Sequence, residues 1–556
     1  MSGNKHRFNR YHMDFLSGLL LLLSFCVIAV IFTMVKGCDV MFYAGFPMMC
    51  AAAAAGISFF GADGFAAERT AVSVKRGREN GPRSVLRGTL TVSLLWGVFV
   101  FAIFYAAAGW IGKAMYGFAK IAPVCRFYAP AIALMLPIGC MTGFLRGIGQ
   151  KRPARMGIWL LTALFLVLSL VCGFYFAYRG VSVGSLLQNE DMSAIYCACG
   201  IALGLDLAAG ISFCVLAFQC WIHEGRLRPG RLQRRGGSEA KEENEDRRVL
   251  QRYFAERMFP ALFAVLVPLL GILVGYRLWL SGQSSAAIIT SVWGGVTGAG
   301  LPVLAGSGVL AALPLTWLTD RALRDRTKGN RQAFYTRISM VLRLSAYISI
   351  PWSVFCFGAA NEIAALFPNL TVRGRMAAIM TIKYGCPLVF LIQTAVLMGY
   401  LFLNSRQERS LIPAGAVAFF AQIIVLVILR GMKLGIVMIG VSLDVYFIVF
   451  LLILYAWGRQ DLLQGLSTSW MIDDGLIAVC SLIAVIPIEF LNDYLIALLP
   501  GYAACLAAAL LYAVVYVFSS ILLKAADLRN VERIPGGGLV VSLAYMIGAA
   551  HAEDEE

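Results

Sequence analysis

Apolar runs of about 20 residues, separated by short polar loops, fill most of this 556-residue sequence. A run of that length crosses the roughly 30 Å hydrocarbon core of a bilayer as a single α-helix. The composition agrees, because 60% of the residues are hydrophobic and only 14% are charged, whereas soluble proteins carry about 25% charged residues. The sequence therefore predicts an all-α polytopic membrane protein.

Fourteen such spans are predicted, each starting and ending at a change from apolar to polar sequence. They cover residues 15–35, 41–63, 88–109, 121–145, 156–178, 194–221, 258–280, 285–318, 338–361, 376–403, 411–429, 435–457, 471–490 and 496–523. The first follows a basic segment, as in a signal peptide, but no small-residue cleavage site comes after it. We therefore expect a retained helix.

The basic residues test this map, because the cytoplasmic loops of membrane proteins are enriched in Lys and Arg. With a cytoplasmic N-terminus, 35 of the 47 Lys and Arg residues fall on the inner side, ten on the outer side and two within spans. This distribution predicts that both termini are cytoplasmic and that the protein lies in the cytoplasmic (inner) membrane. The formal net charge of +16 is therefore a topology signal, and we expect no nucleic-acid partner.

Other functional classes lack their sequence signals. The 14 cysteines and four histidines form no paired metal-binding spacing, so we expect no metal and no disulfide framework. No phosphate-binding GxxxxGK[ST] loop is present, so we expect no fused ATP-driven motor. The longest outer loop, near residues 179–193, offers no cluster of catalytic acids and bases. We therefore expect a protein that is not an enzyme and needs no cofactor other than a coupling ion.

The halves on either side of a charged cytoplasmic segment resemble each other. Pro47 matches Pro302, Gly77 matches Gly329, Gly143 matches Gly399, and the segment RFYAP (126–130) matches KYGCP (383–387), all at offsets between 252 and 257. Four matches in the same order indicate an internal repeat. Because the offset covers six spans, an even number, both copies have the same orientation, as in a two-lobed transporter.

The repeat predicts six segments of the chain. They are a cytoplasmic N-terminus (1–14), an N-lobe of spans one to six (15–221), a flexible cytoplasmic linker (222–257), a C-lobe of spans seven to twelve (258–457), two extra spans (458–523) and a cytoplasmic tail (524–556).

Several stretches carry a resemblance to a known family. They are the charged loop SVKRGRENGPRSVLRGTL after span two, its counterpart LTDRALRDRTKGNRQAFYTRISMVLRL after span eight, LPVLAGSGVLAALPL in span eight, RGIGQKRP after span four and the terminal AADLRNVERIP. With them the chain resembles the multidrug/oligosaccharidyl-lipid/polysaccharide (MOP) exporter superfamily, and within it the branch of stage V sporulation protein B and the lipid II flippases. Fourteen spans favour this branch over twelve-span multidrug exporters.

The resemblance implies two six-helix lobes around a central cavity that opens alternately to each side of the membrane. It also implies a polyprenyl-diphosphate-linked saccharide as the transported partner. The chain departs from the family at one point, since lipid II flippases place arginines in their first and eighth helices. Spans 15–35 and 285–318 contain no charged residue here, which puts lipid II itself in doubt as the substrate.

Two repeat-related cations are the candidates for substrate binding. Arg126 and Lys383 each lie one helical turn before a proline, and Arg or Lys in a wet cavity can bind a diphosphate. The alternative is that both lie near the outer membrane interface and extend toward lipid headgroups. Prolines remove backbone hydrogen bonds, so four of them are candidates for helix bends: Pro130, Pro137, Pro302 and Pro387.

Two intramembrane carboxylates are the candidates for ion coupling. Asp206 lies in span six and Asp444 in span twelve, which are matching helices of the two lobes. A carboxylate within the bilayer costs about 2.5–3.5 kcal/mol on insertion scales, so each needs a partner. Either is a candidate for binding Na⁺ or H⁺. The alternative is a hydrogen bond to a Ser or Tyr side chain of a neighbouring helix.

The sequence thus favours a membrane transporter that moves a lipid-linked oligosaccharide or cell-wall precursor by alternating access. We expect it to act as a monomer, with anionic lipids contacting its arginine-rich inner loops. Three alternatives remain open: a cation-coupled drug or small-molecule exporter of the same superfamily, a membrane-embedded glycan transferase, and a scaffold that transports nothing.

Overall fold

The computed structural model describes residues 15–75, 81–226, 238–283, 285–405, 407–459 and 470–523, together with Gly538 and Ser542. Within these ranges the chain forms helices joined by short turns, and no strand. The predicted N-terminal segment 1–14 lies outside the described residues, as does nearly all of the tail 524–556. The predicted all-α fold is confirmed.

The first lobe is built from six spans. Its main helices are α1 (Phe15–Lys36), α2 (Cys38–Ile57), α3 (Asp63–Lys75), α4 (Gly81–Ala106), α6 (Ala122–Gly147), α7 (Lys151–Leu187) and α8 (Asp191–Arg226). A five-residue π-turn, η1 (Ser58–Ala62), joins α2 to α3, so these helices form one long span. The short helix α5 (Ala108–Trp110) and the turns η2 (Ile111–Met115) and η3 (Ala119–Ile121) lead from α4 to α6.

The second lobe repeats this order. Its helices are α9 (Ser238–Leu280), α10 (Ala286–Gly295), α11 (Leu301–Ala312), α12 (Thr316–Thr327), α13 (Arg331–Gly358), α14 (Ala360–Ala365), α15 (Val372–Tyr384), α16 (Leu388–Asn404), α17 (Leu411–Gly431) and α18 (Val437–Gly458). The π-turn η4 (Val296–Gly300) and the 3-10 turn η5 (Leu313–Leu315) connect α10, α11 and α12 into one span. The second span of each lobe is therefore a long helix interrupted by a π-turn.

Two further helices, α19 (Trp470–Leu498) and α20 (Gly501–Leu522), follow the second lobe. They pack on α13 and α14, and the Tyr512 hydroxyl of α20 donates to the Pro351 carbonyl of α13 at 2.8 Å. The extra helices are thus fastened to the second lobe.

Twelve stretches of the described chain are long and apolar enough to cross a membrane. The pair α15 and α16 counts as one more span, bent by 59° at the break. The described apolar part of α19, Gly475–Leu491, is shorter, and with it the chain reaches the predicted number of about fourteen.

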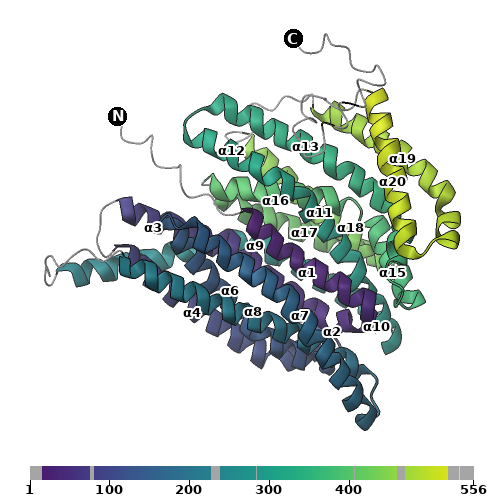
Figure 1. The fold of residues 1–556 in the computed structure, drawn as a ribbon, viewed down its shortest axis with the longest axis horizontal. Coiled ribbons are helices and arrows are strands. Elements are labelled where there is room, and N and C mark those ends of the chain that lie inside the picture. The colour runs from purple at the N-terminus through teal and green to yellow at the C-terminus, as the bar shows by residue number, and fades with distance from the viewer. Residues whose placement is uncertain are drawn as a thin grey trace.

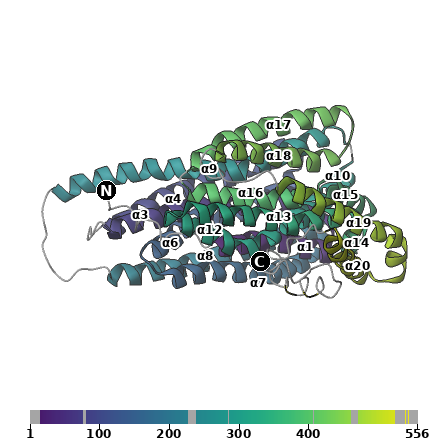
Figure 2. The same ribbon diagram turned by 90° about the horizontal axis from the view of Figure 1, so that it is seen from above.

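Figure 1 shows the two lobes as layers, with α3, α4, α6, α7 and α8 in one and α12, α13 and α16 in the other. They meet where α2 and α10 pack together. At the opposite end, the end of α8 and the start of α9 project beyond the bundle beside α3 (Figure 2). The helix ends that lead into the most basic loops therefore lie at one end of the molecule.

The predicted linker 222–257 stays a prediction as a segment between the lobes, but both of its described ends are helical. Helix α8 continues to Arg226 and α9 begins at Ser238, 20 residues before the predicted span at 258. Glu, Lys and Arg favour helices, and they are frequent in this segment of the sequence. The charged segment therefore extends the membrane helix instead of interrupting it. Residues 227–237 lie outside the described part of the chain.

Candidate transport cavity between the lobes

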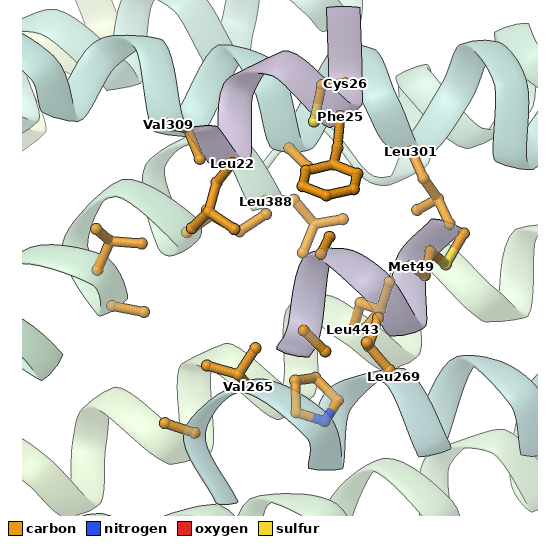
Figure 3. A pocket seen from close by; sticks show the side chains of 18 of the residues that line it. Leu22, Phe25, Cys26, Met49, Val265, Leu269, Leu301, Val309, Leu388 and Leu443 are labelled. Atoms are coloured by element: carbon orange, nitrogen blue, oxygen red, sulfur yellow. The ribbon is translucent and has the colours of Figure 1, made fainter. Parts of the chain in front are cut away.

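A cavity of about 330 Å³ lies between the two lobes. Helices α1 and α2 line it from the first lobe, and α9, α11, α16 and α18 from the second. Figure 3 shows Leu22, Phe25 and Met49 from the first lobe and Leu269, Leu388 and Leu443 from the second around the same space. Both lobes therefore contribute to the walls of one cavity.

The lining contains no charged side chain. Its two hydroxyl groups are already engaged elsewhere. The Thr297 hydroxyl lies 2.9 Å from the Trp293 carbonyl and 3.1 Å from the Met41 carbonyl, and the Tyr400 hydroxyl donates to Asp320 Oδ1 at 2.6 Å. The cavity therefore offers a ligand mostly apolar contact.

An aromatic cluster closes the interface at the end where α2 meets α10. The Trp293 Nε1–H of α10 donates to the Tyr116 hydroxyl of the first lobe at 2.8 Å, and the Tyr276 hydroxyl of α9 donates to the Tyr116 carbonyl at 2.9 Å. The Tyr276 and Trp293 rings lie 4.4 Å apart between centroids. All three side chains are buried, so this end of the interface excludes water.

Two glycines allow the helices of this closure to touch. A Cβ atom on Gly294 would lie 2.1 Å from the Cys38 carbonyl oxygen, and one on Gly298 would lie 2.2 Å from the Thr33 hydroxyl. Neither distance is possible for a real side chain. Gly294 and Gly298 of span eight therefore serve close packing between lobes.

A loop contact completes the same closure. The Asn369 amide of the second lobe donates to the carbonyls of Met34 and Val35, at the end of α1, at 2.8 and 3.0 Å. The last carbonyls of an α-helix have no partner within the helix, so Asn369 satisfies two acceptors of the opposite lobe.

The opposite end of the cavity is closed by different contacts among the described residues. The Phe15 ring of α1 stacks on the Tyr400 ring of α16, with centroids 3.8 Å apart and planes 5° from parallel. Arg257 of α9 forms an ion pair with Glu68 of α3 and donates to the Leu403 carbonyl at 2.8 Å. Tyr400 and Leu403 also line the cavity, so these contacts lie at its edge.

The predicted substrate-binding cations do not line this cavity. The Arg126 guanidinium lies 5.4 Å from the centre of the Tyr105 ring, and the Lys383 ammonium lies 4.9 Å from the centre of the Phe357 ring. In both lobes a cation of the fourth span thus packs on an aromatic ring of the third. Each cation thus makes a cation–π contact within its own lobe. Substrate binding by either residue and the alternative, extension toward lipid headgroups, both stay predictions.

The four prolines differ in their local structure. Pro130 and Pro137 lie inside α6, which is a single helix. Pro302 lies in the first turn of α11, directly after the π-turn. Pro387 stands at the break between α15 and α16, where the chain bends by 59°.

Asp206 lies beside the proline of the first lobe. Its Oδ1 accepts a hydrogen bond from the backbone amide of Ala131, the residue after Pro130, at 2.8 Å. The carboxylate thus has a partner on a neighbouring helix. The partner is a backbone amide and not the Ser or Tyr side chain that the alternative named.

Asp444 lies beside the bend of the second lobe. One turn before it, Gly440 of α18 is so close to Gly385 that an added Cβ would lie 3.3 Å from the Gly385 Cα. Asp444 is 7% exposed, and its Oδ1 has no hydrogen-bond partner among the described residues. Each lobe thus places a carboxylate of its sixth span near the proline of its fourth, but only that of the first lobe is paired at Oδ1.

The lining of the cavity was not predicted from the sequence. Its small residues include Ala52 and Ala53 of the alanine run 51–55, and Ala261 and Ala264 of α9. An alanine run within a span was the available signal, because small side chains leave space between helices. Among the described residues no group of three or more His, Cys, Asp or Glu side chains is placed to hold a metal ion.

No protein-family model and no curated protein sequence matches the chain. Solved structures do match. An inward-facing multidrug resistance MATE family transporter of the MOP superfamily aligns with a TM-score of 0.55 at 15% identity, covering 81% of this chain and 96% of that one. A MOP superfamily transporter from Pyrococcus furiosus gives 0.51 at 14% identity, covering 81% and 96%. The chain therefore has the fold of the MOP superfamily transporters, as the resemblance implied.

The lipid II flippase MurJ, in an inward closed conformation, matches over more of the chain. Its TM-score is 0.60 at 12% identity, covering 91% of this chain and 98% of that one. At these identities the likeness establishes the fold and a multi-pass membrane architecture.

Proposed function

We propose that this protein is a transporter that moves a lipid-linked saccharide or cell-wall precursor outward across the cytoplasmic membrane by alternating access. The observation that carries the proposal is a cavity lined by both repeated lobes and closed by different contacts at its two ends. Opening one set of contacts while keeping the other would expose the cavity to one side at a time.

The extent of the fold supports a lipid-linked substrate. The flippase MurJ covers 91% of the chain, whereas the MATE transporter covers 81%. Helices α19 and α20, which follow the two six-span lobes, are the part of the chain beyond a twelve-span exporter. In this proposal both termini are cytoplasmic, and the protein acts as a monomer that contacts anionic lipids through its basic loops.

We also propose that Asp444 binds the coupling cation, Na⁺ or H⁺. A buried carboxylate without a partner for one oxygen is costly, and a bound cation removes that cost. The bend at Pro387 supplies a second feature, because a proline leaves a backbone carbonyl without its usual amide donor, and such carbonyls can coordinate ions in broken transmembrane helices. Asp206, with its amide partner, is the weaker candidate.

The test is transport by purified protein in liposomes. A fluorescent polyprenyl-diphosphate-linked sugar is placed in the outer leaflet, and its movement is measured by loss of access to a membrane-impermeant quencher, with and without a Na⁺ or H⁺ gradient. We expect gradient-dependent movement by the wild type and none by a cavity-filling variant, Ala264→Trp. Equal movement in empty liposomes and in those with protein would remove the proposal.

One observation favours a second candidate, a cation-coupled exporter of small apolar molecules. A site for a diphosphate would carry charged side chains, whereas the lining of this cavity carries none. Efflux of neutral hydrophobic dyes by the same liposomes, with no movement of the lipid-linked sugar, would select this function.

A further inference from the structure

We infer that the cavity between the lobes binds an uncharged, apolar group, so the part of the substrate held there is hydrocarbon and not a charged headgroup. The inference rests on the proposed transport function and names the chemistry of its ligand. The source of the group is either the polyprenyl chain of a lipid-linked substrate or a free apolar molecule.

The first argument is the character of the lining. The residues around the cavity are aliphatic, aromatic or sulfur-containing, apart from Thr297 and Tyr400. Figure 3 shows only carbon and sulfur atoms on the labelled side chains that surround the space. Binding sites for drug-sized ligands have volumes of about 300–1,000 Å³ and mostly apolar walls, and about 330 Å³ lies within that range.

The second argument is the cost of a charge at this place. An ionised group moved into an apolar site without a partner loses its hydration, which costs several kcal/mol or more. Neither hydroxyl of the lining is free to donate to a diphosphate, since both donate to protein oxygens. The cationic side chain placed at the edge, Arg257, is already paired with Glu68.

The third argument is adaptability. Met48, Met49 and Cys26 line the cavity from the first lobe. Thioether and thiol side chains are polarisable, and the long methionine side chain changes shape at low cost. Such a lining suits a flexible hydrocarbon chain or several apolar shapes, because neither requires fixed polar contacts.

The experiment is photolabelling of the full chain in lipid nanodiscs with a neutral adamantane diazirine, followed by peptide mass spectrometry. Labelling of residues 45–53 and 261–272 is compared with labelling of α20, whose exposed Leu506 and Leu510 report on reagent dissolved in the lipid. We expect the cavity peptides to be labelled several-fold more strongly than α20. Equal labelling would overturn the inference.

Two variants fill the cavity from opposite lobes, Ala264→Trp and Ala52→Phe, and each should abolish the excess labelling. Val171→Trp, on the exposed side of α7, is the matched control and should leave it unchanged. Loss of the excess in the control, or its persistence in both filled variants, would contradict the assignment of the cavity as the labelled site.

Competition on the wild-type protein keeps the inference testable even where a filled variant fails to fold. A neutral polyprenol or a neutral adamantane alcohol should suppress the excess labelling. Stronger suppression by the polyprenol identifies the polyprenyl chain as the source of the group, and stronger suppression by the adamantane alcohol identifies a free apolar molecule. Inorganic pyrophosphate should have no effect. Stronger suppression by pyrophosphate, or by the hydrophobic cation tetraphenylphosphonium, would overturn the uncharged ligand.

These outcomes are separable from those of the transport assay. Specific labelling of a protein that moves no lipid would keep the ligand class and remove the proposed function. Transport without specific labelling would keep the proposed function and remove the assigned ligand class.

Discussion

Single residues decide how the interface between the lobes closes and where charge is held in the membrane. Gly294 and Gly298 leave no room for a Cβ atom, and Asp444 holds a carboxyl oxygen without a hydrogen-bond partner in the described chain. Each of these positions permits a direct test, because a small change of side chain alters a single property.

Replacement of the buried carboxylate should uncouple transport without unfolding the protein. In Asp444→Asn the group that costs about 2.5–3.5 kcal/mol within the bilayer becomes neutral, so we expect unchanged or higher thermal stability. Stimulation of transport by a Na⁺ or H⁺ gradient should disappear. The measurements are a melting curve of the purified protein and liposome transport with and without the gradient.

Asp206→Asn is the comparison for this prediction. Its Oδ1 accepts the Ala131 amide, and an asparagine oxygen can accept the same hydrogen bond. We therefore expect the gradient to keep its effect. Uncoupling in Asp206→Asn with normal coupling in Asp444→Asn would reverse the assignment.

The closure should open when a glycine at the interface is enlarged. Gly294→Ala adds a Cβ atom against the Cys38 carbonyl, and overpacking of this kind costs about 1–3 kcal/mol. The closed state loses that amount relative to an open one, so amides at the start of α2 should exchange faster with deuterium. In the control variant Gly210→Ala the added atom meets no neighbour within 4 Å. Amide exchange at the start of α2 should therefore match the wild type in this variant.

Bent and interrupted helices are the features at the next scale. The second span of each lobe contains a π-turn, and the fourth span is continuous in the first lobe but broken in the second. Both fourth spans carry a proline at the matching position, Pro130 and Pro387. The sequence repeat therefore does not by itself determine whether the helix bends.

Removal of the proline at the break should impair movement more than stability. Pro387→Ala restores an amide donor that can rejoin α15 to α16, so we expect the 59° bend to relax. The transport rate should fall while the melting temperature stays equal or rises. Pro487→Ala, in α19 outside the lobes, should leave transport unchanged, and equal losses in both variants would contradict a specific role for the bend.

The fold was largely predictable from the sequence, whereas the site was not. Span length, charge alternation and the repeat depend on local composition, and they predicted the all-α two-lobed architecture. The cavity depends on which faces of α1, α2, α9 and α16 meet, and a single sequence does not determine these packings. Arg126 and Lys383 were attractive as cations near prolines, yet their neighbours Tyr105 and Phe357 come from a helix earlier in the chain.

At the scale of the whole molecule, two lobes meet through unequal contacts at the two ends of the cavity. One end has the buried aromatic cluster, the glycine packing and the Asn369 bonds. The other has the Phe15–Tyr400 stack and the pairing of Arg257 with Glu68. We expect the second end to open at lower cost, because the Glu68 side chain of its ion pair is 37% exposed whereas the aromatic cluster at the first end is buried.

A charge swap tests the ion pair at that end. Glu68→Arg alone places two cations together and should favour opening, seen as faster reaction of a cysteine introduced at the buried Leu19 of α1 with an impermeant thiol reagent. Arg257→Glu in the same chain should restore much of the protection, although the Leu403 contact is lost. Because the Glu68 side chain is 37% exposed, the pair contributes about 0–1 kcal/mol, and the rate of the cysteine reaction should change a few-fold.

The uncharged lining has a consequence for the electrical behaviour of the transport cycle. A charge that crosses the whole membrane field changes the free energy by about 2.3 kcal/mol for each 100 mV. When the lobes rock, the cavity walls carry no charge with them. The membrane voltage should therefore act on the cycle through the substrate and through intramembrane charges outside the lining, such as Asp206 and Asp444. With a neutral ligand, Asp444→Asn should run at a rate that depends less on voltage than the wild-type rate does.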